Sequence, residues 1–388
     1  MRPGFAVPAL VFSILLAPIG ARAQWQLDGV PLSTAASSQY NPTIVSDGSG
    51  GAIVTWYDYR SGTNYDIYAQ RLDASGVAQW TADGVALCSA ADDQSDPTIV
   101  SDGSGGAIVT WHDRRSGTNY DIYAQRLDAS GVAQWAANGV ALCSAADHQQ
   151  VPTIVADGSG GAIVTWYDYR SGTNSDIYAR RVNASGVAQW TANGVALCTA
   201  ANAQLYPTIV SDGSGGAIVT WHDYRSGTND DIYARRVNAS GVAQWTANGV
   251  ALCSAANNQL YPAIVSDGSG GAIVTWYDLR SGTNYDIYAR RVDASGVAQW
   301  TADGVALCSA VNAQLSPAIV SDGSGGAIVT WHDYRSGTNY DIYARRVNAS
   351  GVAQWTANGV ALCSAADHQQ VPTIVADGSG GAIVTWYD

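Results

Sequence analysis

The stretch SDGSGGAIVTW, residues 46–56, decides the fold of this chain, because it returns six more times at a constant interval of 55 residues. The copies, two of which begin with Ala instead of Ser, cover residues 101–111, 156–166, 211–221, 266–276, 321–331 and 376–386. Such a fixed period is typical of solenoids, propellers and other repeat architectures. A unit of this kind cannot bury its own apolar faces, so it depends on its neighbours for stability.

Each unit predicts four β-strands separated by turns. In the first unit the expected strands cover residues 42–46, 52–58, 66–73 and, as two pieces of one fourth strand, 77–80 and 85–88. The glycine-rich residues 47–51 predict a hairpin turn, since glycine supplies positive φ and Asp47 can close an Asx-turn. Residues 52–58 are rich in β-branched and aromatic residues, as strands are. No window has the periodicity of a helix.

Repeated four-stranded antiparallel units predict an all-β fold, a β-propeller, in which every blade is covered by its neighbours. Residues 24–388 would form this domain, with whole repeats starting near residues 42, 97, 152, 207, 262 and 317. We expect seven blades, the last being the partial repeat 372–388, with residues 24–41 supplying the outer strand of the closing blade. Six blades with an overhang, or a β-solenoid, are the alternatives.

The N-terminus predicts export. Residues 1–23 resemble a signal peptide, with Arg2 as the positive region, the apolar run 5–19, and the small-x-small pattern at 21–23. The protein is therefore expected in the periplasm, at the cell surface or outside the cell, with no membrane span after cleavage. An uncleaved N-terminal anchor is the alternative.

The composition argues against nucleic acid as a partner and against disulfide bonds. After residue 23 the chain has no Lys, Glu, Phe or Met, and its formal net charge is −13, which argues against binding of nucleic acid. The six cysteines recur at one position of the repeat. Equivalent positions in stacked sheets lie about 10 Å apart, too far for a disulfide, so we expect small buried side chains.

Residues 56–68, WYDYRSGTNYDIY, resemble the blades of TolB-like propellers, which carry an aromatic residue, Asp-x-Arg, a glycine turn and Asp-Ile-Tyr. The chain is also similar to exported bacterial propeller proteins without an assigned activity. This resemblance implies a propeller that binds protein or glycan, and it implies no chemistry. Residues 47–56 have a looser similarity to the Asp-box of sialidases.

Three charged residues, Asp58, Arg60 and Asp66, recur in every complete unit. Identical use in all units favours structural ion pairs that hold the loop between the second and third strands; a ring of ligand contacts is the alternative. No catalytic residue and no cofactor or metal is expected. A calcium ion held by Asp47 and its turn is the alternative.

The units differ mainly in two loops, one between the second and third strands and one between the fourth strand and the next first strand. In a four-stranded meander both loops emerge on the same face, and loops on rigid scaffolds carry function. Neutral drift of exposed positions is the alternative explanation of this variation. The candidate binding residues are Tyr40, Tyr59, Asp96, Arg114, Tyr169, Tyr206, Tyr224, Tyr261 and Tyr334.

The sequence thus predicts an exported, monomeric, non-enzymatic β-propeller that serves as a binding or scaffold module, with a protein or carbohydrate as ligand. A multivalent lectin with one sugar site in each gap between blades is one alternative. A sialidase-like glycoside hydrolase is another, but it needs two carboxylates in different environments, and the framework Asp residues all have copies.

Overall fold

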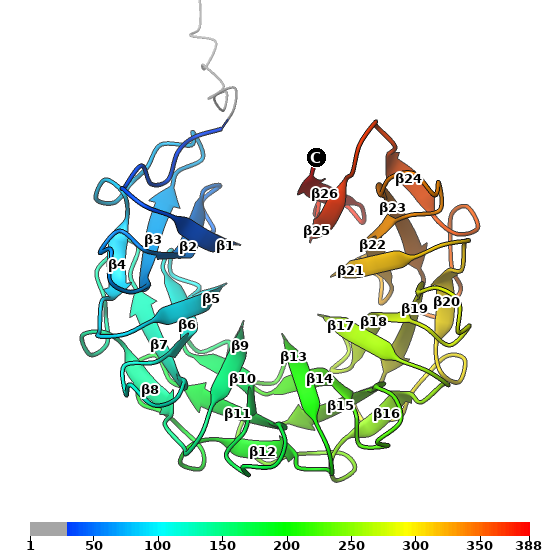
Figure 1. The fold of residues 1–388 in the computed structure, drawn as a ribbon, viewed down its shortest axis with the longest axis horizontal. Coiled ribbons are helices and arrows are strands. Elements are labelled where there is room, and N and C mark those ends of the chain that lie inside the picture. The colour runs from blue at the N-terminus through cyan, green and yellow to red at the C-terminus, as the bar shows by residue number, and fades with distance from the viewer. Residues whose placement is uncertain (1–28) are drawn as a thin grey trace, which may run out of the picture.

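The computed structural model describes residues 29–388, which form an all-β molecule. Six four-stranded antiparallel sheets follow one another along the chain, and a two-stranded sheet comes last. Figure 1 shows the sheets side by side around a central opening, with the first strand of each sheet nearest the centre. The predicted β-propeller of 55-residue repeats with an incomplete seventh blade is therefore confirmed.

The strands recur with nearly constant bounds. The innermost strands are β1 (Gln39–Ser46), β5 (Gln94–Ser101), β9 (Gln149–Ala156), β13 (Gln204–Ser211), β17 (Gln259–Ser266), β21 (Gln314–Ser321) and β25 (Gln370–Ala376). The second strands are β2 (Ala52–Asp58), β6 (Ala107–Asp113), β10 (Ala162–Asp168), β14 (Ala217–Asp223), β18 (Ala272–Asp278), β22 (Ala327–Asp333) and β26 (Ala382–Tyr387). The third strands are β3 (Asp66–Leu72), β7 (Asp121–Leu127), β11 (Asp176–Val182), β15 (Asp231–Val237), β19 (Asp286–Val292) and β23 (Asp341–Val347). The outermost strands are β4 (Val85–Cys88), β8 (Val140–Cys143), β12 (Val195–Cys198), β16 (Val250–Cys253), β20 (Val305–Cys308) and β24 (Val360–Cys363).

Within residues 29–388 there are strands and turns but no helix, and so no helical segment that could cross a membrane. The predicted signal peptide, residues 1–23, lies outside the described residues.

The glycine-rich hairpin is closed by its aspartate, as the sequence predicts. Asp47 Oδ1 accepts hydrogen bonds from the backbone N–H groups of Ser49 and Gly51, both at 2.8 Å. Gly48 and Gly50 have φ values of 76° and 89°, which other residues adopt only with strain. The turn therefore depends on the aspartate for its hydrogen bonds and on glycine for its backbone.

The hydrophobic core lies between neighbouring sheets rather than inside any one of them. Ile67 of β3 and Leu87 of β4 pack against Trp111 of β6 and Leu127 of β7 in the next sheet. The same contacts recur in the following gaps, where the second-strand tryptophans are fully buried. Burial of one such side chain is worth up to about 4–6 kcal/mol, so each sheet is stabilised chiefly by its neighbours.

A second tryptophan in each unit links one sheet to the next. Trp135 Nε1 donates to the backbone oxygen of Ala184, at 3.1 Å, in the turn that follows β11. Gly186 of that turn lies so close to the indole that a Cβ atom there would be 2.5 Å from the Trp135 ring. The turn between the third and fourth strands therefore forms the packing site for the tryptophan of the preceding sheet.

Two strand boundaries differ from the sequence prediction by more than one residue. The innermost strand begins at Gln39, before the expected start at residue 42, and its register shifts between Tyr40 and Thr43. This shift is a β-bulge, which lets the strand continue past Pro42. The fourth strand comprises Val85–Cys88 alone, because Ala78 makes only an isolated bridge to Leu72 and the chain then turns toward the next sheet.

The segment expected to close the ring, residues 24–41, is only partly described. Residues 29–38 contain no strand, and Figure 1 shows the first and last sheets apart. Thr34 N donates to Asp83 Oδ1 at 2.6 Å, which repeats the contact of Ser89 N with Asn138 Oδ1 one unit later. This segment therefore occupies, against the first sheet, the place that a preceding sheet's outer strand would take; closure of the ring remains a prediction.

We expect Gly186→Ala to destabilise the protein by about 2–4 kcal/mol, because it combines a strained φ of 78° with a clash against Trp135. Gly172→Ala is the matched control: its φ of 71° is also positive, but nothing lies within 4 Å of the new Cβ. It should cost only about 1 kcal/mol. Denaturant unfolding followed by tryptophan fluorescence measures both changes in unfolding free energy. Equal losses of stability would show that the turn does not need a glycine to pack against Trp135.

Candidate functional site

The recurrent aspartate and arginine at the end of the second strand form a buried framework pair. Asp223 is fully buried and accepts hydrogen bonds from Trp221 Nε1 (2.7 Å) and from Arg225 N, Nε and Nη2 (2.9, 2.8 and 2.6 Å). Arg225 lies over the ring of Tyr233, with its guanidinium carbon 3.6 Å from the centroid. The first unit has the same pair, Asp58 with Arg60, at 2.6 Å.

Arg225 also links its own loop to the turn before β16 and to a strand of the preceding sheet. Its Nη2 donates to the backbone oxygen of Asn248 at 2.7 Å and to Cys198 Sγ of the preceding sheet at 3.3 Å. The cysteines are all free, and five of the six are buried. Burial raises the pKa of Cys198 to about 12, so this thiol is an unreactive packing group.

Asp66, the third residue of the predicted ion-pair set, takes no part in an ion pair among residues 29–388. Its Oδ1 accepts a hydrogen bond from Asn64 Nδ2 at 3.0 Å. Burial raises the pKa of Asp66 to about 6, and its copies Asp121 and Asp176 show the same shift. The ion-pair prediction is therefore correct for Asp58 and Arg60 and wrong for Asp66.

A second ion pair, which the sequence analysis missed, joins the first hairpin to the third strand. Arg71 Nη2 lies 2.8 Å from Asp47 Oδ2, and the pair is repeated in all complete units. Asp47 Oδ1 is already bonded to two backbone N–H groups. Because four N–H donors occupy its two oxygens, Asp47 is not free to hold calcium. No group of three potential metal ligands occurs within the described residues.

The two variable loops do lie on the same face, as predicted. Tyr224 N, in the loop after β14, donates to the oxygen of Ala203 at 2.8 Å, and Gln259 N donates to the oxygen of Asp230 at 2.8 Å. The first contact joins the loops within one unit and the second joins neighbouring units. We call this side of the ring the loop face; the hairpins of residues 47–51 and 73–77 lie on the other side.

The bulge of each innermost strand presents one side chain at the inner edge of the loop face. We call these residues, which directly precede the prolines, the inner rim: Asn41, Asp96, Val151, Tyr206, Tyr261, Ser316 and Val371. All have a φ between 46° and 51°, a strained conformation for any residue except glycine. Asn41 Nδ2 donates to Asp96 Oδ1 at 3.0 Å, so adjacent rim residues are in contact. Sequence reasoning had placed this position in a loop.

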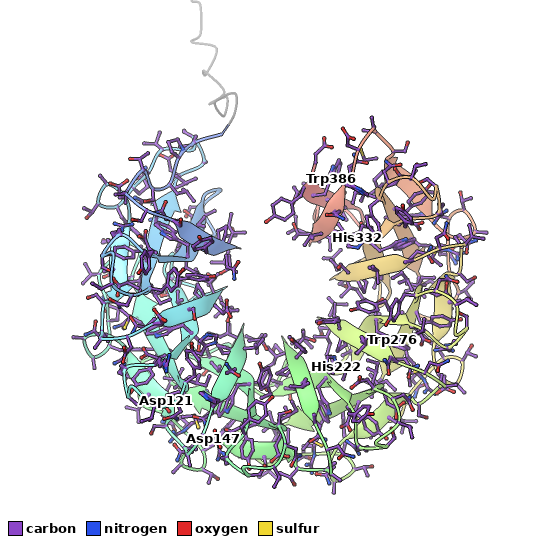
Figure 2. All side chains as sticks on the ribbon, in the orientation of Figure 1. Asp121, Asp147, His222, Trp276, His332 and Trp386 are labelled. Atoms are coloured by element: carbon purple, nitrogen blue, oxygen red, sulfur yellow. The ribbon has the colours of Figure 1, made fainter. Side chains whose placement is uncertain are left out.

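The rim is aromatic in the middle of the ring. The Tyr206 and Tyr261 rings lie 4.9 Å apart between centroids, and both are exposed. Beneath them lie Tyr167, His222 and Tyr277, which come from β10, β14 and β18. Sequence reasoning missed these three supporting residues; the strict alternation of Tyr and His at their position was the available signal. Figure 2 shows His222 toward the inner side of the ring.

Of the other predicted binding residues, Tyr169 borders this centre through Tyr167, and the rest lie along the loop face in other units. Tyr40 and Tyr59 belong to a separate aromatic group in the first unit, with Tyr57 and Tyr65. Asp96 lies beside Asn41 and 3.8 Å from His112 Nε2. The remaining residues line the loop after each second strand: Arg114 and Tyr224, both exposed, Tyr169 against Tyr167, and Tyr334 against Tyr340.

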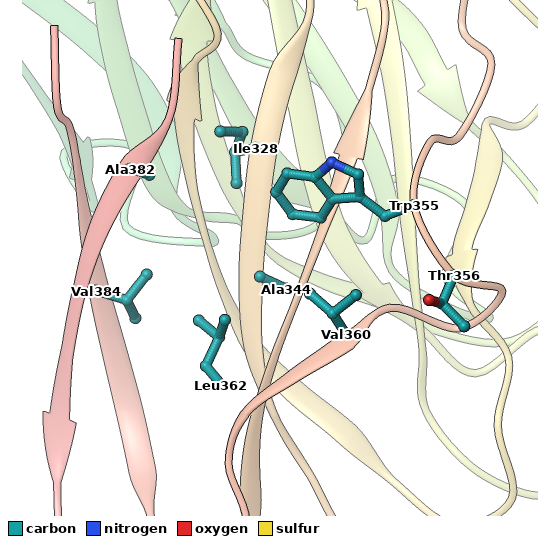
Figure 3. Close-up of a pocket in the computed structure, with 8 residues that line it drawn as sticks. All are labelled: Ile328, Ala344, Trp355, Thr356, Val360, Leu362, Ala382 and Val384. Atoms are coloured by element: carbon teal, nitrogen blue, oxygen red, sulfur yellow. The ribbon is translucent and has the colours of Figure 1, made fainter. Parts of the chain in front are cut away.

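One hollow is an unfilled packing space between sheets. It measures about 570 Å³ and lies between the sixth sheet and the two-stranded seventh, with Ile328, Leu362 and Val384 among its walls (Figure 3). In the gap before it, Val347 of β23 fills the equivalent space. The hollow is thus the counterpart of the inter-sheet core in the preceding gap.

No protein family model and no curated protein matches the chain. Among solved structures, a PL25 ulvan lyase bound to -[GlcA(1-4)Rha3S]- is similar at 9% identity with a TM-score of 0.52, covering 84% of this chain and 83% of that chain. An unknown-function protein from Dyadobacter fermentans DSM 18053 has 11% identity and a TM-score of 0.44, covering 76% and 90%. The Hadza microbial sialidase Hz136 has 11% identity and a TM-score of 0.43, covering 80% and 69%.

At such identities the likeness concerns the fold alone, and the lyase comparison supports a β-propeller with four-stranded blades. The class defined by fold is therefore the β-propeller. The lyase is an enzyme, but a shared fold does not by itself decide between catalysis and binding.

We expect Asp223→Ala to cost about 3–5 kcal/mol of stability, because it leaves Arg225 and the Trp221 indole N–H without their buried acceptor. The control is Asp293→Asn in an outer turn, where the chain itself uses Asn at the equivalent position 238. This change should cost less than about 0.5 kcal/mol. Chemical denaturation of both variants tests the framework role, and a small loss in Asp223→Ala would contradict it.

His222 should make stability depend on pH. Burial lowers the pKa of His222 from 6.5 to about 4, so the folded state resists protonation. Its stabilising contribution is complete above pH 6.5 and falls as the pH decreases toward 4. His222→Tyr uses the residue found at the equivalent positions 167 and 277 and cannot be protonated there.

Relative to the parent protein, His222→Tyr should therefore gain about 2 kcal/mol in unfolding free energy between pH 7 and pH 5. Groups common to both proteins, including Asp231 with its pKa raised to about 6, cancel in this difference. Denaturant unfolding at the two pH values measures it. A difference independent of pH would show that His222 titrates normally in the folded state.

Proposed function

We propose that this chain is an exported, non-enzymatic binding module that contacts a protein or carbohydrate ligand through its loop face. The observation that carries the proposal is the contrast between framework and inner rim. The framework pairs are repeated with the same partners from unit to unit. The seven rim positions carry five different residue types on one continuous edge.

Rigid presentation of varied side chains suits binding. The rim residues sit on strands held by the inter-sheet core, and their backbone is constrained by the following proline and the bulge. Aromatic side chains fixed in this way supply contact area with little loss of conformational entropy. Strained backbone retained at equivalent positions is also typical of functional sites.

The geometry favours a binding module over the two alternatives, a multivalent lectin and a glycoside hydrolase. A lectin with one site in each gap needs the same contact residues in each gap, whereas the exposed tyrosine pair occurs once, at Tyr206 and Tyr261. A hydrolase needs a pair of available carboxylates. Asp223 and Asp212 are bonded to arginines. Asp231, which has no arginine partner among residues 29–388, accepts a hydrogen bond from Asn229.

The proposal also includes the cellular location of the protein and the class of its ligand. The resemblance to TolB-like blades favours a module acting outside the cytoplasm, and the predicted signal peptide 1–23 favours the periplasm, the cell surface or the surrounding medium. The low positive charge of the chain favours ligands other than nucleic acid.

The triple variant Tyr206→Ala, Tyr224→Ala, Tyr261→Ala tests the loop face. The purified protein is applied to an array of immobilised glycans and extracellular proteins, and the affinity for each captured ligand is measured. We expect the triple variant to bind at least tenfold more weakly, because it removes exposed aromatic area from the loop face.

The matched control is Val187→Ala, Val242→Ala, Val297→Ala, which removes exposed side chains from the opposite side of the ring and should leave affinity unchanged. Unchanged affinity in the tyrosine variant would exclude the loop face as the binding surface. Turnover of fluorogenic glycosides by the parent protein would contradict the non-enzymatic assignment.

A further inference from the structure

Tyr206 and Tyr261 form a small aromatic platform at the inner rim. Their exposed fractions are 37% and 45%, their ring centroids lie 4.9 Å apart, and their planes are inclined by 45°. They come from β13 and β17, which are equivalent strands of neighbouring sheets. The platform therefore offers two adjacent ring surfaces to a ligand that lies along the edge of the central opening.

The platform is supported from below by buried or half-buried rings. Tyr206 lies 6.0 Å from Tyr167 and 5.2 Å from His222, while Tyr261 lies 5.6 Å from His222 and 5.5 Å from Tyr277. The backbone N–H of Tyr261 also donates to His222 Nδ1 at 3.5 Å. Because each exposed ring rests on two others, the platform is formed before any ligand arrives.

A hollow of about 390 Å³ continues the platform toward the sixth and seventh sheets. Its walls are Tyr261, Pro262, Ala263, Tyr277, Ser316, Pro317, Val371 and Pro372. The site is thus a recessed edge beside the central opening, with room for a narrow chain. A flat protein interface needs about 800 Å² on each partner, which two rings in a recess do not offer.

The chemistry around the platform is polar but largely uncharged. The neighbouring segments present the amides Asn202, Asn257 and Asn312, all exposed. The chain contains no lysine, and its net charge of −13 disfavours an anionic ligand. Aromatic rings stack on the C–H faces of pyranose sugars, and amides and tyrosine hydroxyls exchange hydrogen bonds with sugar hydroxyls.

We propose that the Tyr206–Tyr261 platform binds a neutral, unbranched polysaccharide chain, with successive sugar rings stacked on the two tyrosines. This inference rests on the proposed function and narrows it to one ligand class at one place. The spacing of the two rings is comparable with the length of one sugar residue, so neighbouring residues of a chain can contact both rings. A single such site per molecule follows, in place of one site per blade.

The chain supplies its own test substitutions. Ser316 stands at the equivalent rim position with φ of 51°, so Tyr206→Ser and Tyr261→Ser introduce a residue that this backbone already accommodates. The reverse change, Ser316→Tyr, places a third ring beside Tyr261 and above Tyr277 and His332, as Tyr261 lies above His222 and Tyr277.

The experiment is isothermal titration of the full chain with cellohexaose, xylohexaose and mannohexaose as neutral probes, and with hexagalacturonate as an anionic probe. We expect at least one neutral hexasaccharide to bind with one site per molecule, and hexagalacturonate not to bind. Tyr206→Ser and Tyr261→Ser should each weaken binding at least tenfold, the double variant should abolish it, and Ser316→Tyr should strengthen it at least threefold. Unfolding midpoints near that of the parent show that the variants are folded.

The outcomes separate this inference from the proposed function. If no neutral hexasaccharide binds, or if binding survives in the double variant, the polysaccharide site is overturned. If the array instead yields a protein ligand whose binding is lost in the tyrosine variants, the loop face is upheld and the polysaccharide inference is overturned. Several equivalent sites per molecule would also overturn it in favour of a multivalent lectin.

Discussion

The structure depends on the buried Asp–Arg pair at the end of each second strand. Asp223 fixes the indole of Trp221, and Arg225 reaches the cysteine of the preceding sheet and a backbone oxygen before the outer strand of its own sheet. Breaking one partner would leave an uncompensated charge against the core, where desolvation is costly. The pair thereby holds the loop after the second strand at a constant position in every unit, and the loop face is built from these loops.

This rigid repetition explains how variation can be confined to one edge. The inter-sheet cores contain nearly the same side chains in each gap, so a change there would disturb two sheets at once. Rim residues such as Tyr206 and Tyr261 contact one another and the residue at the Tyr57 position, so they can change without affecting the core. Val151, by contrast, also packs against an inter-sheet core. The price of this freedom is local strain, since every rim residue has a positive φ before a proline.

The proposed binding role of the rim and the structural role of the framework rest on the same geometry. The framework carboxylates are bonded to arginines and backbone N–H groups, and the thiols are buried with raised pKa values. The aromatic residues of the middle sheets are instead presented on the inner edge of the ring, supported and partly exposed. The side chains left available on the loop face are therefore suited to stacking and hydrogen bonding.

The sequence by itself determined the strands, the Asx-closed hairpin, the repeat and the face that carries the variable loops, because these follow from local propensity and a strict 55-residue period. Only the tertiary structure decided which residues meet between units. The bulge let each innermost strand run through the residue before the proline, Arg71 rather than Asp66 joined the ion-pair framework, and Tyr206 met Tyr261 across two sheets. Register and contact across neighbouring sheets depend on packing between distant residues, which no local pattern encodes.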